Sequence, residues 1–424
     1  MKRDCQVAIA PLTRVEGHGN IRIRIEQGRL LEARWEVVET PRFFEAMLKG
    51  KTWENAPWIT GRICGICSIG HTLASIRAVE RAFGIEPGPC TTRLRLLLKH
   101  METLQSHSLH LFFLVLPDLL GVGSVLPLLE THRETVLLAS RIKKLANDAC
   151  DLVGGRRLHP TRTVVGGFTL YPQPAELAAL RERLQAVLPD LDEAAALFGS
   201  LPLPDFQRPT EFVSLAGTDA YPFIGGEVVS TDGVRQTEDG YRALTNEYLV
   251  PRSTAKWCRL SRSSFAVGAL ARFNNNAHLL APAARALAAG LGLAPVCHNP
   301  FANNLAQLVE CVHVVHDAIT LIDELLAGDL EPDRQPVRPR AGLGVAAVEV
   351  PRGILYHAYQ LSDSGRIMAC DCVIPTGQNH ANIQADLTAL AADFARRGHG
   401  DQDLELLAAM LVRAYDPCIS CSVH

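Results

Sequence analysis

Four cysteines form two pairs of the same spacing, one pair near each end of the chain. Cys64 and Cys67 lie in the run RICGIC, and Cys418 and Cys421 lie in DPCISC, close to the last of the 424 residues. Two intervening residues let both sulfurs of a pair face one ion, and thiolate ligands favour zinc, iron–sulfur clusters, copper(I) or nickel. The spacing therefore predicts one site of four thiolates that forms only when folding brings the two ends together.

A structural zinc site is the simplest alternative. Zinc ribbons usually close within about 15–20 residues, whereas about 350 residues separate these two pairs. Length alone does not exclude zinc, because extending a loop from about 20 to about 350 residues adds only about 2–3 kcal/mol, which a structural zinc site can supply. The residues around the cysteines must therefore distinguish the metals.

The composition indicates a large, mixed-charge globular protein. Apolar residues make up 47% of the chain, enough for one large domain or two closely packed ones, and the formal net charge is −3. The charge pattern gives no sign of nucleic-acid binding. The 12 cysteines are scattered without a disulfide pattern, as expected for a reduced, cytoplasmic protein.

Neither the N-terminus nor the most apolar internal stretch has the pattern of a signal or a membrane span. The apolar run near the N-terminus is too short for a secretory signal. The stretch 109–129 contains His110, Asp118 and two prolines, so it is expected to form a buried helix and a turn. These patterns predict a cytoplasmic protein with no direct membrane span.

The elements that must position the cysteines are predicted to be mainly helical. Isoleucines alternate with polar residues over 20–26, which predicts a hairpin with one buried face. Long helices are predicted over four segments: 91–116, 126–152, about 175–196 and 302–327. The expected fold is mainly α with small β-sheets, in one domain over residues 1–424 with a central bundle of long helices.

Smaller elements are predicted around this bundle. The segment 206–250 is rich in Gly, Thr, Asp and aromatic residues, which favours strands and loops in a possible peripheral insertion. A proline- and charge-rich linker at 329–339 leads to a β-hairpin within 345–374 and two closing helices. The last helix, 404–415, is expected to stop because Pro417 disfavours helix in the residue before it.

The residues around the cysteines resemble one known family, the large subunit of nickel–iron hydrogenases. The motifs that carry the resemblance occur in the family's order along the whole chain: RVEGHG, PRFFEAMLKG, RICGICSIGH, GGRRLHP, VPRG, IPTGQN and DPCISCSVH. The resemblance implies the fold of that large subunit. It also implies a catalytic subunit that reversibly cleaves dihydrogen into protons and electrons.

In this family, the four cysteines hold a nickel–iron centre. The resemblance implies that Cys64 and Cys418 are terminal nickel ligands, and that Cys67 and Cys421 bridge nickel to an iron that carries carbonyl and cyanide. Cys418 also resembles the thiolate that accepts a proton when dihydrogen is split.

Four further residues of these motifs match positions around that centre. Arg352 resembles an arginine above the open face of the metals, and Asp416 resembles the residue that holds it. Glu16 resembles the acid that takes a proton from Cys418 and passes it toward water. His71 resembles a histidine that hydrogen-bonds a bridging sulfur and tunes the metal.

Three of these residues also have plain structural alternatives. Arg352 would then be a surface arginine at a hairpin bend. Glu16 would be an ion-pair partner of Arg14 or another cation, and His71 would be a satisfied core residue.

The resemblance also implies a pocket for the carbonyl and cyanide ligands, in which the hydroxyl group of a threonine donates to a cyanide. The residues that match this pocket are Pro351, Pro375 and Thr376. One position departs from the family, because Ser106, before His107, stands where an aspartate is common. Arg352 is therefore expected to be held less firmly.

A second metal ion is implied beside the centre. Glu45 and His424 resemble two ligands of a magnesium or iron ion, and the carbonyl of Cys372 would be the third, with waters completing an octahedron. In the family, a maturation endopeptidase removes a C-terminal peptide just after this histidine. The sequence is thus expected to be the mature form.

The chain needs a partner to carry electrons away. Apart from the four paired cysteines, it has no cluster pattern for an iron–sulfur relay, and it has no G-x-G-x-x-G fingerprint at a strand–helix turn. The resemblance implies an obligate iron–sulfur small subunit, with further diaphorase or electron-transfer subunits, as in soluble NAD(P)- or deazaflavin-linked enzymes. Three alternatives stay open: a hydrogen sensor with the same metal site, a quinone-binding homologue from respiratory complexes, and a non-enzymatic zinc scaffold.

Overall fold

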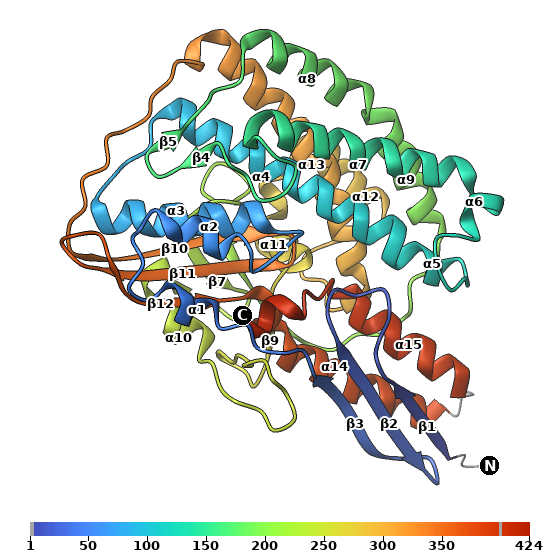
Figure 1. Ribbon diagram of the computed structural model, residues 1–424. Helices are drawn as coiled ribbons and strands as arrows, with labels where there is room; N and C mark the ends of the chain where they lie inside the picture. Colours follow the sequence, from blue (N-terminus) through green and yellow to red (C-terminus); the bar gives the residue numbers. More distant parts are fainter. Residues whose placement is uncertain (1–3, 398–400) are drawn as a thin grey trace.

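Most of the long helices gather in the upper part of Figure 1, whereas the last two helices of the chain lie lower, beside the sheet at the N-terminus. The structure is a computed structural model that describes residues 4–397 and 401–424. These residues form helices of up to 23 residues and four small sheets. The predicted mainly α fold with small β-sheets is therefore confirmed.

The helical layer contains the predicted bundle of long helices. Its five main members are α4 (Pro89–Leu109), α7 (Arg133–Gly154), α8 (Pro174–Ala186), α9 (Leu188–Ser200) and α13 (Asn303–Glu324). α4 lies between α7 and α13 and packs on both, and α13 also packs on α8 and α9. Leucines, valines and alanines on the facing sides of these helices are buried and hold the bundle together by removing apolar surface from water.

Three of the predicted helices are divided in the structure, by a change of helix type or by a break in the helix. α4 passes into a π-helical segment, η1 (His110–Val115), and then into α5 (Leu116–Leu119). The segment predicted as one helix over 126–152 begins as the short α6 (Leu128–Thr131) and starts again after His132 as α7. The alanine-rich segment breaks at Val187, because a proline enters the first turn of α9, where its missing N–H is not needed.

α13 is the core helix predicted over 302–327. Within the part of the chain that the structure describes, the stretch Pro300–Gly328 is the only helix long and apolar enough to cross a membrane, but 78% of its most apolar window is buried inside the protein. Its apolar character is explained by the neighbouring helices α4 and α12 (Pro282–Gly290), which cover it.

The sheet nearest the cysteines is a three-stranded antiparallel meander. The predicted hairpin consists of β10 (Gly342–Val350) and β11 (Gly353–Leu361), and β12 (Ile367–Val373) adds a third strand. α3 (Ser68–Phe83) lies across β10 at very short range. A Cβ atom on Gly344 would lie 1.9 Å from the carbonyl oxygen of Ala78, so glycine allows this close helix–strand contact.

The segment 206–250 forms the predicted strands and loops, but one of its strands lies deep in the protein. β6 (Glu211–Ala216) pairs with β7 (Glu227–Ser230) and, in parallel, with β9 (Phe265–Ala266), while β8 (Arg235–Gln236) pairs with β7. Five of the six residues of β6 are buried. This strand is therefore not peripheral, because it packs against α11, β10 and β11. That the segment is an insertion stays a prediction.

The two ends of the chain meet around the third sheet. β1 (Cys5–Ile9), β2 (Gly19–Glu26) and β3 (Arg29–Val37) form an antiparallel sheet in which the isoleucines of β2 are buried, as the alternation predicts. β1 was not predicted. α14 (Pro375–Arg397) packs on β3, and α15 (Asp401–Ala414) packs on β1.

Short elements complete the fold: α1 (Phe44–Leu48), α2 (Asn55–Thr60), β4 (Thr163–Val164), β5 (Gly167–Phe168), η2 (Glu238–Gly240), α10 (Tyr241–Thr245), α11 (Ala269–Asn276), η3 (Ala277–Leu279), η4 (Pro300–Ala302), η5 (Leu325–Asp329) and η6 (Ser420–Val423).

Candidate metal centre

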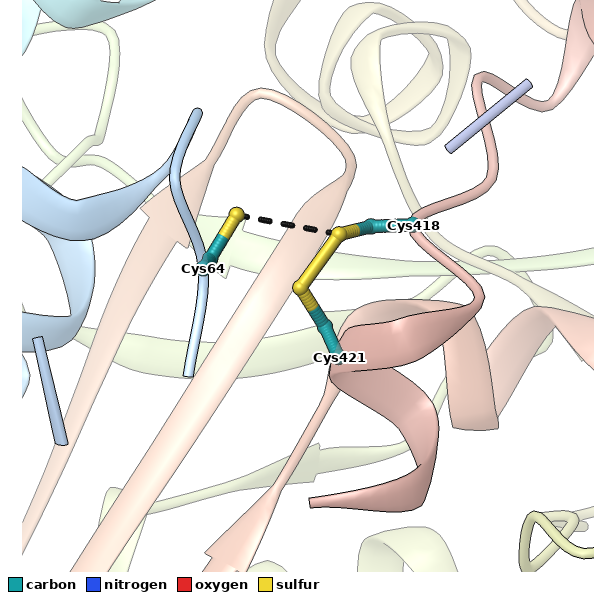
Figure 2. Close-up of side chains that lie close together, drawn as sticks. All are labelled: Cys64, Cys418 and Cys421. Atoms are coloured by element: carbon teal, nitrogen blue, oxygen red, sulfur yellow. Dashed lines mark hydrogen bonds between the residues drawn. A yellow bond between two sulfur atoms is a disulfide. The ribbon is translucent and has the colours of Figure 1, made fainter. Parts of the chain in front are cut away.

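The two cysteine pairs, far apart in sequence, lie together in the structure. Cys64 and Cys67 occupy the turn between α2 and α3, and Cys418 and Cys421 follow α15 at the end of the chain. The Sγ atoms of Cys64 and Cys418 are 3.6 Å apart, and Figure 2 shows them facing each other from two separate loops. All four cysteines are at most 3% exposed.

The sulfurs are spaced as donors to a metal. The sulfurs of Cys64, Cys418 and Cys421 lie within 4.8 Å of one another, and so do the possible ligand atoms of Cys67, His71 and Cys421. Cys418 and Cys421 form a disulfide in this structure, so both must be thiolates before they can bind an ion. The site thus offers four sulfurs, which is the donor set of a soft metal.

The Cys64 and Cys67 thiols differ in how readily they ionise. Burial opposes ionisation of Cys64, but hydrogen bonds and the charge of Arg352 outweigh it, so its pKa lies below the usual value. Two of these bonds come from the N–H groups of Ile66 and Cys67, at 3.3 and 3.0 Å from the Cys64 sulfur. The hydrogen bond to Cys64, followed by burial, raises the pKa of Cys67 well above its usual range. Of the two thiols, Cys64 is therefore the one that ionises more readily.

Arg352 lies beside the cysteines at a buried hairpin bend. It occupies the turn between β10 and β11 and is 3% exposed. Its Nε donates to the carbonyl oxygen of Asp416 at 2.7 Å, and its Nη2 donates to the Asp416 carboxylate at 3.0 Å. Burial opposes the charge of Arg352, but Asp416, Cys67 and Cys64 together raise its pKa. The hairpin bend of the structural alternative is correct, whereas a surface position is not.

Two buried polar atoms at this site have no hydrogen-bond partner among the residues that the structure describes. They are the Nη1 of Arg352 and the Nε2 of His71. The hydroxyl of Ser106 is also buried and has no described partner, so it does not bind Arg352. The hydrogen bonds that hold Arg352 come from Asp416. Buried polar atoms are rarely left unsatisfied, and the unpaired N–H of Arg352 beside the four sulfurs therefore fits a bound group with an acceptor atom.

Glu16 is tied to the tail that carries Cys418. A β-bridge joins the two residues, and the N–H of Ile419 donates to the Glu16 carbonyl at 2.9 Å. The Glu16 carboxylate accepts hydrogen bonds from the N–H of Ser420, at 3.1 Å, and from the Ser420 hydroxyl. Arg14 instead binds Asp118 and the carbonyl of Leu114. The structure therefore brings Glu16 to Cys418 and does not pair it with Arg14.

Gly17 makes this approach possible. Its φ is +82°, and a Cβ atom there would lie 2.7 Å from the nitrogen of Ser420. Any other residue would push the tail away from Glu16.

His71 lies one turn into α3 and begins a buried chain of hydrogen bonds. Its Nδ1 is 3.2 Å from Nε2 of His357, whose Nδ1 is 2.7 Å from the hydroxyl of Tyr359. That hydroxyl donates to Ser75. Burial lowers the pKa of His71 well below its usual value and that of His357 to about 3, so both rings are neutral near pH 7.

The residues expected around the ligand pocket also lie near the cysteines. Thr376, in the first turn of α14, accepts a hydrogen bond from the N–H of Cys418 at 3.0 Å. Pro375 begins the same helix, and Pro351 precedes Arg352 in the hairpin turn. Within the described part of the chain, no acceptor binds the hydroxyl proton of Thr376, so it can be donated to another group.

The three residues of the expected second metal site also come together. The Nε2 of His424 is 3.4 Å from Oε1 of Glu45, and the N–H of Cys372 donates to the same oxygen at 2.8 Å. Burial raises the pKa of Glu45, but His424 and the N–H of Cys372 hold it below the usual value. A carboxylate and an imidazole at this spacing could bind a divalent ion.

Sequence reasoning missed several residues that support these groups. His357 and Tyr359 lie two apart on β11, so they share a face of the strand. Their spacing of two residues in a predicted strand was the sequence feature from which their proximity could have been predicted. Arg272, Glu310 and Glu349, which lie behind the Arg352 turn, have no such local signal.

Comparisons with known proteins agree with this geometry. The family profile described as "Nickel-dependent hydrogenase" matches residues 42–149 and 253–424, more than half of the chain. A second profile, described as "HoxL-like", matches residues 6–40.

Curated relatives match over nearly their whole length. The chain is 36% identical to "Sulfhydrogenase 1 subunit alpha" of Pyrococcus furiosus, over 99% of this chain and 97% of that protein. It is 27% identical to "NAD-reducing hydrogenase HoxS subunit beta" of Cupriavidus necator, over 99% and 94%.

Solved structures give the same result for the fold. A crystal structure of an NAD+-reducing NiFe hydrogenase in the H2-reduced state superposes with a TM-score of 0.89 at 29% identity, over 99% of each chain. The Ni-Fe-Se hydrogenase from D. vulgaris Hildenborough superposes with a TM-score of 0.77 at 23% identity, over the full length of both chains, which supports the fold alone. From the site and these matches together, the chain belongs to the nickel-dependent hydrogenase family, as a catalytic large subunit and an oxidoreductase acting on dihydrogen.

Proposed function

We propose that the four cysteines hold a nickel–iron centre with carbonyl and cyanide on the iron, and that the protein reversibly cleaves dihydrogen there. The observation that carries this proposal is the meeting of four buried sulfurs from opposite ends of the chain. When bound, the centre would supply a soft, electron-rich metal pair for heterolytic cleavage. The proposal assigns Cys64 and Cys418 to nickel, and Cys67 and Cys421 to both metals.

The proposed roles of the surrounding residues follow from their contacts. Arg352 brings a fixed positive charge and an unpaired N–H to the cysteines, which suits it to polarise a substrate or hold a cyanide. Asp416 holds that guanidinium in place. His71 directs an unpaired ring nitrogen into the site and tunes the sulfurs.

Glu16 is proposed to carry the proton. The Cys418 sulfur holds a proton after cleavage, and the Glu16 carboxylate, bridged to the same residue, accepts it and passes it toward solvent. Glu16 suits this role because it is half-buried and thus lies between the core and the solvent. Among the described residues, its carboxylate accepts hydrogen bonds from Ser420 alone.

Further parts of the proposal rest on the family. Glu45, His424 and the carbonyl of Cys372 would hold a magnesium or iron ion, and Pro351, Pro375 and Thr376 would surround the carbonyl and cyanide. An iron–sulfur small subunit would take the electrons, and further diaphorase subunits would pass them to NAD(P) or a deazaflavin in the cytoplasm. The relative named as a subunit of an NAD-reducing hydrogenase supports the NAD-linked form of such an assembly. A maturation endopeptidase would complete the C-terminus.

Elemental analysis and infrared spectroscopy of the purified enzyme test the proposal. Nickel and iron in about equal amounts at the site, carbonyl and cyanide stretching bands and dihydrogen-dependent dye reduction are expected. Zinc alone, with no such bands, would instead identify a scaffold. A full metal centre with negligible turnover would indicate a hydrogen sensor.

A further inference from the structure

The turn that presents Arg352 is buried, which creates an unusual demand for hydrogen-bond donors. Val350 pairs with Gly353, so Pro351 and Arg352 alone form the bend between β10 and β11. All four residues are buried. A turn normally lies at the surface, where water satisfies its carbonyl groups, and a buried turn needs donors from the protein.

Arg272 on α11 supplies these donors. Its Nη1 donates to the carbonyl of Val350 at 3.0 Å, and its Nη2 donates to the carbonyl of Pro351 at 3.2 Å. Its other three N–H groups bind the two Glu310 oxygens, at 2.6 and 2.7 Å, and Glu349 at 2.9 Å. All five donors of the guanidinium are therefore used, in a side chain that is 0% exposed.

The two carboxylates that hold Arg272 are themselves fixed from other elements. Glu310, on α13, accepts from the hydroxyl of Tyr221 at 2.7 Å and lies 2.7 Å from Nε2 of His107 on α4. Glu349 accepts from the N–H of Leu215 on β6 at 2.8 Å. The guanidinium thus has one possible position, set by the helical bundle on one side and the sheets on the other.

We propose that Arg272 is a positioning residue for dihydrogen cleavage, which holds the Val350–Pro351 backbone so that Arg352 stays against Asp416 and the cysteines. Among its described hydrogen bonds, Arg272 contacts the backbone of the turn and none of the four cysteines. Lysine cannot replace it, because one ammonium group cannot reach two carbonyls and two carboxylates in a planar fork. The inference rests on the proposed function for its effect on turnover, but its effect on the position of Arg352 is independent of that function.

The test compares Arg272→Lys with Arg95→Lys in the purified holoenzyme. Arg95, on α4, is a matched control, since it is also buried, binds both oxygens of a glutamate (Glu80) and donates to one carbonyl (Val164). Its partner Glu80 lies near the C-terminal end of α3, whereas Cys67 precedes the N-terminal end. Turnover per bound nickel is expected to fall by up to about 100-fold in Arg272→Lys, as for a small misplacement of a reacting group. It should stay within about twofold in Arg95→Lys, because that arginine holds no part of the site.

A crystal structure of each variant shows whether Arg352 has moved. A residue that only stabilises the fold would leave the position of Arg352 unchanged. The Arg352–Asp416 contacts should be lost or displaced in Arg272→Lys and intact in Arg95→Lys. Normal turnover per nickel in Arg272→Lys, or an unmoved Arg352 with turnover lost, overturns the proposal. If Arg272→Lys does not fold, Glu349→Gln weakens the same fork more gently. A several-fold loss of turnover with a shifted Arg352 is expected there, and wild-type turnover overturns the proposal.

Failure of the proposed function would look different. A wild-type protein that holds only zinc and does not cleave dihydrogen removes that function. The displacement of Arg352 in the variant would still decide the positioning role.

Discussion

At Cys64, two backbone N–H groups and the charge of Arg352 favour a thiolate, whereas Cys67 keeps its proton. Metal binding must displace the remaining protons, so it depends on every sulfur of the set. Serine at any of the four positions offers a hard oxygen that binds nickel poorly. We therefore expect Cys→Ser at position 64, 67, 418 or 421 to abolish both nickel content and dihydrogen-dependent dye reduction.

Cys311→Ser is the matched control for these variants. Cys311 is buried in α13 and is a free cysteine, so its replacement should leave nickel content unchanged. Native nickel content and full activity in any one of the four site variants would remove that cysteine from the ligand set.

Arg352 combines a charge with a planar fork, and the two properties can be separated. Two N–H groups of the guanidinium bind Asp416, and Nη1 has no hydrogen-bond partner among the described residues. Arg352→Lys keeps the charge but loses the fork. We expect turnover to fall at least about 100-fold, as when one preorganised donor is removed, with nickel and iron content unchanged. Retention of more than half of the activity would return Arg352 to a structural role.

Glu16 offers a clean separation of proton transfer from metal chemistry. Glu16→Gln keeps the size and the acceptor for Ser420 but cannot carry a proton. We expect the variant to keep nickel and iron and still convert para- to ortho-dihydrogen. Turnover and isotope exchange with water should collapse. Exchange with water at the normal rate would mean that the proton leaves by another route, and loss of both exchange reactions would point to misfolding.

At the scale of elements, the contact between α3 and β10 sets the position of Cys67 and His71. Cys67 immediately precedes α3, His71 lies one turn inside it, and the helix rests on glycines of the strand. In Gly344→Ala, the new methyl group would meet the backbone oxygen of Ala78 at 1.9 Å. Because backbone cannot move aside cheaply, we expect the free energy of unfolding to fall by about 1–3 kcal/mol, measured by thermal or denaturant unfolding.

The same displacement should loosen the metal site, since α3 would move as a unit. Nickel retained after dialysis is expected to fall in Gly344→Ala. Gly290→Ala is the control, because a Cβ atom on Gly290 in α12 meets nothing within 4 Å. That variant should be neutral or slightly stabilised. Equal stability of the two variants would contradict the proposed helix–strand constraint.

The elements that could be predicted from the sequence are those with a strong local pattern. The buried isoleucines of β2 and the apolar run of α13 identify themselves by period and length. The break at Val187 was not predicted, although Pro189 in the first turn of α9 is the kind of residue that marks a helix start. By contrast, β1 has five residues and becomes a strand through its pairing with β2, which no local pattern specifies.

At the scale of the whole molecule, some residues of the site could be identified from a local sequence pattern and others could not. The cysteines, Glu16 and Arg352 lie in short motifs, so their resemblance to a family identified them. Arg272 and Glu310 are isolated in sequence and meet only because α11 and α13 cross behind the β10–β11 turn. Their partnership depends on tertiary packing, and a single sequence gives no signal for it.

The four cysteines come from both ends of the chain, so a bound metal would join these ends. The tail after α15 is already held by the N-terminal part of the chain. Arg42 donates to the carbonyls of Ile63 and Ser420 at 2.7 and 2.6 Å, and Ile419 donates to Glu16. Metal–thiolate bonds would add a direct link between the two ends. Because the metal binds only the folded arrangement, it should stabilise that arrangement by mass action, by about 4 kcal/mol at a thousandfold excess over its dissociation constant.

We therefore expect the holoenzyme to unfold at a higher temperature than metal-free protein prepared under reducing conditions. Hydrogen exchange should locate the effect. The amides of Ile419 and Ser420, which donate to Glu16, should exchange more slowly when metal is bound, because the tail must detach before they meet water. Amides in the middle of α13 serve as an internal reference, since they open only with the whole bundle. In Cys418→Ser, the difference between metal-loaded and metal-free protein should disappear. Equal unfolding temperatures and equal exchange of the tail amides in the two forms would mean that the protein closes its ends without help from the metal.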